Sequence, residues 1–223
     1  HLRIISVLTR PILERLRRDK VIHLLAVFLS RQEERRNMLD LSKIKAFVFD
    51  VDGVFTDGGV LSMPDGDLLR TFDSKDCFAV RTAVNNGYIA AFLTGGVSQS
   101  LIYRALSLGI ERDDIYMLAK NKIDPFMEFC KKYNLDPQEV AYFGDDIPDI
   151  EVLKICGVSV CPSDAVQQVK EVCKYISPNP GGKRCVREFI ERVLTLHGKW
   201  IFNPTEPWKG EHPEHIVKVK ESL

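Results

Sequence analysis

Asp50 and Asp52 are two carboxylates, one residue apart, at the end of an apolar run that begins at residue 45 and breaks at Gly53. The run has the composition of a strand buried on both faces. In open α/β sheets, ligands bind at the carboxyl ends of such strands. Two carboxylates held this close repel each other unless a cation lies between them or one is protonated. The pair therefore predicts a metal site or an acid/base pair, and the alternative is a polar strand end before a turn.

Thr94 and Gly95 follow a second apolar run, residues 88–93. A threonine hydroxyl and the backbone N–H groups of a glycine turn can bind phosphate oxygens, although a plain turn would explain both residues equally well. Lys122, at the start of a predicted helix, would add a positive charge to this group. The alternative for Lys122 is an ordinary solvated lysine.

Asp145, Asp146 and Asp149 follow a third apolar run, residues 140–143. Strands of a parallel sheet end at the same edge, so acids about a hundred positions after Asp50 can lie beside it. We therefore expect the three groups of polar residues to converge on one site.

The elements that must position these residues follow an α/β pattern. Short apolar runs alternate with amphipathic stretches, which predicts a Rossmann-like, doubly wound parallel sheet with crossover helices. Strands are expected from residue 45 and at residues 88–93, 115–118, 140–143, 158–161 and 175–176, and helices near 75–86, 97–108, 123–133 and 186–196. Residues 59–71, with apolar residues on both sides of Pro64-Asp65-Gly66, predict a short β-hairpin insertion.

Composition excludes several other classes of protein. The 223 residues carry 31 Lys or Arg and 31 Asp or Glu, so the overall charge gives no reason to expect a nucleic-acid partner. None of the six cysteines forms a CxxC pair, and most lie in apolar stretches. They are typical of reduced, buried thiols in a cytoplasmic protein, and the spacing does not favour the alternative of a zinc site.

The two ends of the chain differ from its centre. Residues 1–42 form a basic extension, expected to be helical or disordered, since residues 1–40 carry nine Lys or Arg against five acids. The apolar run at residues 21–29 is far short of the roughly 20 residues that span a bilayer, and contact of this extension with a membrane surface is the less favoured alternative. Residues 43–198 are expected to form the main domain, followed by an extended tail at 199–223 that contains three prolines.

Four motifs in order resemble those of the haloacid dehalogenase superfamily of phosphohydrolases. They lie at residues 50–56, 93–95, 121–122 and 144–149, and the resemblance covers roughly residues 43–198. The resemblance implies that Asp50 is the nucleophile, which forms an aspartyl-phosphate, and that Asp52 is the general acid and base. It also implies Mg²⁺ bound by Asp50, by the backbone carbonyl of Asp52 and by Asp145, with Asp149 orienting the bound waters.

The same resemblance assigns Thr94, Gly95 and Lys122 to the transferring phosphoryl group. An acid at position 52 suits an ester leaving group, which needs a proton. Too few residues separate the motifs to hold a cap domain, so the protein is expected to be capless. A neighbouring subunit would then close the open site.

Within the superfamily, the layout resembles the 3-deoxy-D-manno-octulosonate 8-phosphate phosphatase family, whose members are homotetramers that act on a phosphorylated keto sugar acid. Asp57 and the segment 181–188 add to this resemblance. Phosphatases of nine-carbon, sialic-acid-type sugar phosphates are the close alternative. A non-catalytic domain associated with a sugar nucleotidyltransferase is the alternative from a different class.

Two positions depart from the family pattern. Gly96 stands where many members carry an arginine, and Cys77 stands in a stretch that usually has glycine, which adds bulk. Arg81 is a candidate to supply charge for the sugar carboxylate, as are two basic residues of the segment 181–188, and each is equally plausible as an ordinary surface residue. Asp57 is a further candidate for substrate binding.

Overall fold

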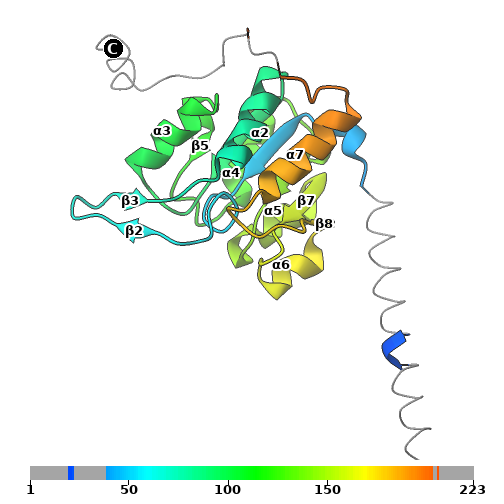
Figure 1. The fold of residues 1–223 in the computed structure, drawn as a ribbon, viewed down its shortest axis with the longest axis horizontal. Helices are drawn as coiled ribbons and strands as arrows, with labels where there is room; N and C mark the ends of the chain where they lie inside the picture. The colour runs from blue at the N-terminus through cyan, green and yellow to red at the C-terminus, as the bar shows by residue number, and fades with distance from the viewer. Residues whose placement is uncertain (1–19, 23–38, 203–204, 206–223) are drawn as a thin grey trace, which may run out of the picture. The chain divides into compact units, whose positions relative to one another are not determined.

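The computed structural model describes residues 20–22, 39–202 and 205 of the chain (Figure 1). The chain divides into two units, residues 1–39 and 40–223. Of the first unit, only residues 20–22, which are helical, and residue 39 are described, so most of the predicted basic extension lies outside the described residues. No helix in the described part of the chain is long and apolar enough to cross a bilayer. The predicted main domain lies in the second unit.

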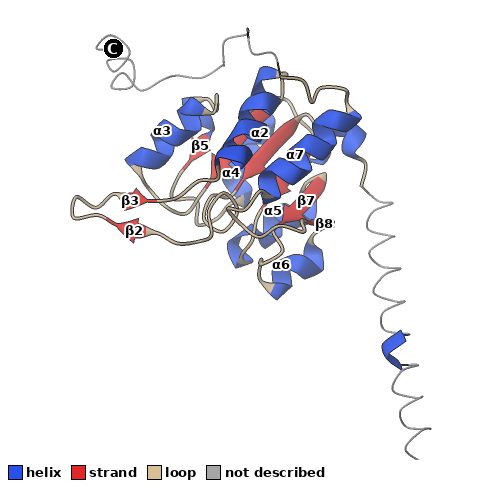
Figure 2. Cartoon of the chain, viewed as in Figure 1, coloured by secondary structure: helices blue, strands red, loops and turns tan. Residues whose placement is uncertain are grey.

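The second unit is built on a six-stranded, all-parallel sheet with the strand order β5-β4-β1-β6-β7-β8 (Figure 2). Its strands are β1 (Ala46–Phe49), β4 (Ile89–Leu93), β5 (Ile115–Tyr116), β6 (Val140–Phe143), β7 (Val158–Cys161) and β8 (Tyr175–Ile176). In sequence order this is the 3-2-1-4-5-6 arrangement of the Rossmann fold, which confirms the predicted fold class.

Strand β1 lies at the centre of the sheet, where the direction of winding changes. Phe47 pairs with Ala90 of β4 on one side and with Ala141 of β6 on the other. All four residues of β1 are fully buried, as expected for a strand with helices on both faces. The ends of β1, β4 and β6 therefore meet at the position where a doubly wound sheet binds its ligands.

Helices cover both faces of the sheet. They are α2 (Ser74–Asn85), α3 (Gln99–Ser107), α4 (Ile123–Lys132), α5 (Ile150–Ile155), α6 (Gln167–Val172) and α7 (Cys185–Leu196). Helices α2 and α7 lie side by side on one face (Figure 1), where Phe189 of α7 packs edge-on against Phe143. Helices α4, α5 and α6 pack on the other face, where Phe126 meets Tyr142.

Several helix ends follow from single residues. Ser98 accepts the backbone N–H of Leu101 and so starts α3, and Asp73 does the same for Lys75 at α2. Gly87 follows α2 with a φ of 87°, the left-handed conformation that glycine adopts at little cost. Helices α5 and α6 were not predicted, since each has six residues and is too short for a clear helical periodicity.

The predicted hairpin is present as β2 (Leu61–Ser62) and β3 (Leu68–Leu69), which pair antiparallel. The backbone N–H of Met63 donates to the carbonyl of Asp67, and this bond closes the turn. The hairpin projects from the body of the unit (Figure 1), and Leu61 is 63% exposed. Within residues 39–202 it is the insertion between β1 and α2, and the described chain contains no cap domain.

The cysteines and the start of the C-terminal tail are also described. All six cysteines are buried, which confirms that part of the prediction, and their reduced state stays a prediction. The tail begins by packing on the main domain, because the ring of Trp200 lies edge-on to Phe78 and the guanidinium of Arg187 lies over Trp200. Apart from residue 205, the tail after residue 202 lies outside the described residues.

Candidate active site

An open cavity of about 440 Å³ lies at the carboxyl ends of β1, β4 and β6. It is lined by Asp50, Asp52, Thr94, Gly95, Gly96, Ala119, Lys120, Lys122, Asp145, Asp146 and Pro148. The residues that the sequence placed at three separate strand ends therefore do converge. The contacts and burial of each side chain indicate the role that it can have in this cavity.

Asp50 is the first residue after β1 and is only 7% exposed. Its backbone N–H donates to the carbonyl of Phe143, and its Oδ1 accepts the N–H of Val51 at 2.7 Å, so the carboxylate is held in one orientation. Burial raises the pKa of Asp50, the charge of Asp149 raises it further, and Lys122 opposes both. A positive charge is therefore needed to keep this carboxylate ionised at neutral pH.

Lys122, at the start of α4, supplies that positive charge. Its Nζ lies 3.0 Å from Oδ2 of Asp50 and 2.7 Å from Oδ1 of Asp149, and its side chain is 5% exposed. Burial alone would lower the pKa of Lys122, but the charges of Asp50 and Asp149 outweigh it and raise the pKa overall. Lys122 is thus a buried, charged residue of the site, which excludes the alternative of a solvated surface lysine.

Asp149 is completely buried, and its four interactions use both of its carboxylate oxygens. Oδ1 accepts the hydroxyl of Tyr142 at 2.6 Å in addition to Lys122. Oδ2 accepts the backbone N–H groups of Asp145 and Asp146 at 3.1 and 3.2 Å. Since its acceptor positions are taken, Asp149 can shape the site from behind but has little capacity left to bind an ion directly.

Asp145, unlike Asp149, has a carboxylate oxygen that can still accept a ligand. One of its oxygens, Oδ1, is buried and has no hydrogen-bond partner among the described residues. Burial, followed by the charges of Asp50 and Asp149, raises the pKa of Asp145. An unpartnered buried carboxylate oxygen is costly unless a ligand satisfies it.

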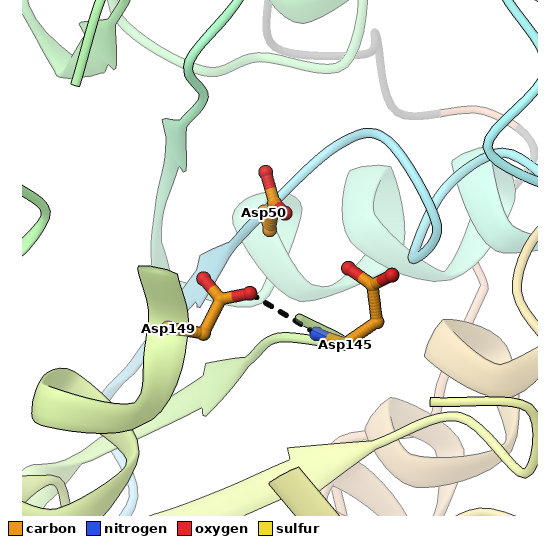
Figure 3. Close-up of side chains that lie close together, drawn as sticks. All are labelled: Asp50, Asp145 and Asp149. Carbon is orange, nitrogen blue, oxygen red and sulfur yellow. Dashed lines mark hydrogen bonds between the residues drawn. The ribbon is translucent and has the colours of Figure 1, made fainter. Parts of the chain in front are cut away.

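Asp50, Asp145 and Asp149 together form an acidic cluster, in which one carboxylate oxygen from each residue lies within 4.8 Å of the other two (Figure 3). Asp50 follows β1, Asp145 lies in the loop after β6, and Asp149 lies directly before α5. An all-oxygen, anionic set of this kind fits a hard divalent cation such as Mg²⁺. Asp50 and Asp145 would be the side-chain ligands, with Asp149 supporting them.

Two glycines allow this close approach of the carboxylates. A Cβ on Gly53, which has a φ of 87°, would lie 2.0 Å from Oδ2 of Asp145. A Cβ on Gly144 would lie 2.4 Å from the Cβ of Asp149. Gly53 in turn is backed by the loop that precedes α7, because a Cβ on Gly181 would lie 2.0 Å from the carbonyl oxygen of Gly53.

Thr94 and Gly95 also line the cavity. Thr94 is buried, and its backbone is fixed by bonds to Tyr116 on β5 and to Ala119. Its Oγ1 accepts the N–H of Gly96 at 3.2 Å, which shapes the turn. The hydroxyl and the turn therefore face the same cavity as the carboxylates and Lys122.

Asp52 also lines the cavity, but its carboxylate is not part of the acidic cluster. It is paired with Arg70, which lies just after β3 in the hairpin. Sequence reasoning missed Arg70, because no pattern signals that the hairpin folds back onto the site. The expected contact of the backbone carbonyl of Asp52 with the metal stays a prediction.

The structure does not bring Asp57 or Arg81 to the cavity. Asp57 is exposed and accepts the backbone N–H of Gly59 within its own turn. Arg81 lies on α2, where its Nε and Nη2 donate to the backbone carbonyl of Ser107 at the end of α3. As placed, both side chains act within the protein rather than on a ligand in the cavity.

Comparison with known proteins identifies hydrolases that resemble this chain. The sequence profile of haloacid dehalogenase-like hydrolases matches residues 100–182. The 3-deoxy-D-manno-octulosonate 8-phosphate phosphatase of Escherichia coli is 31% identical over 162 residues, which cover 73% of this chain and 85% of the relative. The enzyme of the same name from Yersinia pestis is 30% identical over 158 residues, which cover 71% of this chain and 83% of the relative.

This chain belongs to the haloacid dehalogenase-like hydrolase family.

Solved structures of the family share the fold. The 3-deoxy-D-manno-octulosonate 8-phosphate phosphatase of Yersinia pestis aligns with a TM-score of 0.69 and 28% identity, over 78% of this chain and 90% of that structure. The enzyme from Moraxella catarrhalis, solved in complex with magnesium, phosphate and KDO, aligns with a TM-score of 0.67 and 29% identity, over 73% and 91%. Family membership makes the cavity at the ends of β1, β4 and β6 the candidate active site of a hydrolase.

Proposed function

We propose that this chain is a Mg²⁺-dependent phosphomonoesterase that hydrolyses 3-deoxy-D-manno-octulosonate 8-phosphate to the free sugar acid and phosphate. The observation that carries the proposal is the meeting of a buried, Lys122-paired Asp50 with the unpartnered oxygen of Asp145 in one open cavity. The similar phosphatase of Escherichia coli supports the choice of substrate, and the magnesium, phosphate and KDO bound to the Moraxella catarrhalis enzyme support both substrate and cofactor.

In the first step, a carboxylate oxygen of Asp50 attacks phosphorus, and the bond between phosphorus and the sugar oxygen breaks. Asp52 gives its proton to the departing oxygen. In the second step, water attacks the phosphorus of the aspartyl-phosphate while Asp52 takes up a proton, which releases phosphate and restores Asp50. Bound by Asp50, Asp145 and the carbonyl of Asp52, Mg²⁺ would offset the negative charge on the phosphoryl oxygens.

Lys122, Thr94 and Gly95 hold the phosphoryl group in this proposal. The ammonium of Lys122 already lies 3.0 Å from Asp50, and so beside the carboxylate that attacks. The hydroxyl of Thr94 and the N–H groups of the turn face the same space from β4. Donors placed before the reaction begins stabilise the charge that develops on the transferring group.

We further propose a cytoplasmic homotetramer in which a neighbouring subunit closes the capless site. Four apolar residues of the hairpin region support this, because they are exposed on the isolated chain: Val60, Leu61, Met63 and Leu69. Contact with nucleic acid has no support in the balanced charge of the chain.

A phosphatase of nine-carbon sugar acid phosphates is the second candidate. Gly96 supports this second candidate, because many members of the eight-carbon family carry an arginine at that position. A non-catalytic domain associated with a nucleotidyltransferase is the third candidate. The presence of Asp50, Asp52 and Asp145 around one cavity supports the enzyme instead.

The deciding experiment measures phosphate release from the eight-carbon and nine-carbon sugar acid phosphates with Mg²⁺. We expect release from the eight-carbon ester to be the faster, and Asp50→Asn to lower it by at least about 10³-fold. Asp113→Asn, an exposed aspartate outside the site, is the matched control. No release from either ester, or full release by Asp50→Asn, would overturn the proposed activity, and a preference for the nine-carbon ester would overturn the substrate.

A further inference from the structure

Arg70 binds the carboxylate of Asp52 through two parallel hydrogen bonds. Its Nε donates to Oδ1 at 2.6 Å, and its Nη2 donates to Oδ2 at 2.9 Å. A guanidinium and a carboxylate that meet in this way fix each other's plane as well as their distance. The carboxylate of Asp52 therefore has a defined orientation, set by a residue 18 positions away on the hairpin.

The hairpin in turn fixes the guanidinium of Arg70. Its remaining nitrogen, Nη1, donates to the backbone carbonyl of Leu68 at 2.9 Å. The same carbonyl accepts the hydroxyl of Ser98, which starts α3, so the hairpin is tied to the body of the domain. The side chain of Arg70 is only 2% exposed, whereas that of Asp52 is 32% exposed and faces the cavity. Arg70 thus lies behind Asp52 as seen from the cavity.

Gly96 leaves the space that Arg70 occupies. A Cβ at this position would lie 2.7 Å from Nη2 of Arg70, which is closer than such contacts allow, and 3.8 Å from Oδ2 of Asp52. A side chain at position 96 would therefore push Arg70 away from Asp52. The two residues therefore depend on each other: the guanidinium of Arg70 has room beside Asp52 because position 96 carries no side chain.

We propose that Arg70 is a positioning residue for the reaction. It orients the carboxyl group of Asp52 toward the leaving oxygen, and Gly96 keeps the space for it open. The inference rests on the proposed function, because it assigns a role to Arg70 in the proton transfer from Asp52. When the phosphorus–oxygen bond breaks, the proton of Asp52 moves to the sugar oxygen, and the Asp52 carboxylate that remains is the species that Arg70 binds.

A comparison of two leaving groups tests this role. The alkoxide of a sugar needs a proton to depart, whereas p-nitrophenolate departs from p-nitrophenyl phosphate as an anion. We expect Arg70→Met to lower kcat/KM for the sugar acid phosphate by about 10- to 10²-fold, part of the full effect of a general acid. For p-nitrophenyl phosphate, kcat/KM should change by less than about threefold, since it reports the steps up to transfer onto Asp50.

Two further variants sharpen the test. Gly96→Ala should give the same selective loss on the sugar ester, smaller in size, because it displaces Arg70 without removing it. Arg192→Met is the matched control, since Arg192 also pairs with a carboxylate, that of Glu188, but on α7. It should leave both substrates unaffected.

Each outcome bears on the inference. Equal losses on both substrates in Arg70→Met would show a merely structural role, and no loss on either would show that Asp52 needs no positioning; both results overturn the inference and leave the proposed function intact. If Arg70→Met does not fold, Gly96→Ala carries the same comparison. If the wild-type protein releases phosphate from neither substrate, the proposed function itself fails.

Discussion

The ammonium nitrogen of Lys122 lies 3.0 Å from the nucleophile candidate Asp50, in a position where neither side chain has free access to water. The same nitrogen lies 2.7 Å from Asp149. One buried cation thus serves two buried carboxylates. Because one positive charge balances two negative charges, the site is sensitive to any change in its charge.

Replacing Lys122 with methionine should destabilise the protein. The variant leaves Asp50 and Asp149 buried without their cation, and breaking a buried pair in this way costs about 3–5 kcal/mol of the free energy of unfolding. Urea unfolding without metal measures the loss, and added Mg²⁺ should restore part of it. Lys45→Met is the control, because Lys45 pairs with Glu139 at the surface and such pairs contribute about 1 kcal/mol or less. Equal losses in the two variants would contradict the expectation.

Gly53→Ala should weaken Mg²⁺ binding, because the new methyl group would collide with Asp145. Gly87→Ala is a matched control: Gly87 has the same φ of 87°, but nothing lies within 4 Å of the position of its Cβ. Both variants should lose about 1–2 kcal/mol of stability from backbone strain. Only Gly53→Ala should also raise the Kd for Mg²⁺, measured by calorimetry. A similar Kd in both variants would show that Gly53 matters for backbone conformation alone.

Binding of Mg²⁺ should release protons near neutral pH. Burial and mutual repulsion raise the pKa values of Asp50 and Asp145, so without metal these carboxyls hold protons at a higher pH than free aspartate does. Since Mg²⁺ binds the ionised form, its affinity should increase between about pH 6 and pH 8. Calorimetry in two buffers of different ionisation enthalpy counts the protons. Asp145→Asn should release fewer, and an affinity independent of pH would contradict the prediction.

Asp76 should make the stability of the fold depend on pH. Its buried carboxylate accepts the N–H groups of Arg184 and Arg187 at the start of α7, and burial raises its pKa from 3.8 to about 6 despite these bonds. Between these values the folded chain binds more protons than the unfolded chain does, so the contribution of Asp76 to stability is full below about pH 4 and falls as the pH rises through about 6.

The variant Asp76→Asn lacks this titration. The free energy of unfolding of the wild type, relative to the variant, should therefore fall by up to about 3 kcal/mol from pH 4 to pH 7. Any constant offset, from the lost acceptor, does not affect the comparison. Parallel stability curves for the two proteins would show that the carboxyl group does not titrate in this range.

The sequence was sufficient for the parts of the fold that rest on local patterns. Strands β6, β7 and β8 begin and end where the apolar runs do, because each run is bounded by turn residues. The acids converge as expected, since parallel topology alone brings strand ends together. The pairing of Arg70 with Asp52 could not be predicted in this way, because no local pattern shows how the predicted hairpin folds back onto the site. The contact of Arg81 could not be predicted either, because its partner is the backbone carbonyl of Ser107, and a backbone acceptor leaves no signal in the sequence.

The loop that backs Gly53 comes from near the end of the folded unit. The N–H of Gly182 donates to the carbonyl of Val54, and Cys185 contacts the same oxygen. During synthesis, the turn that carries Asp52 therefore lacks its support until residue 182 has left the ribosome. A chain that stops earlier contains all four motifs but lacks the backbone contact that supports this turn. The order of translation thus separates the synthesis of the four motifs from the contact that holds the first of them in place.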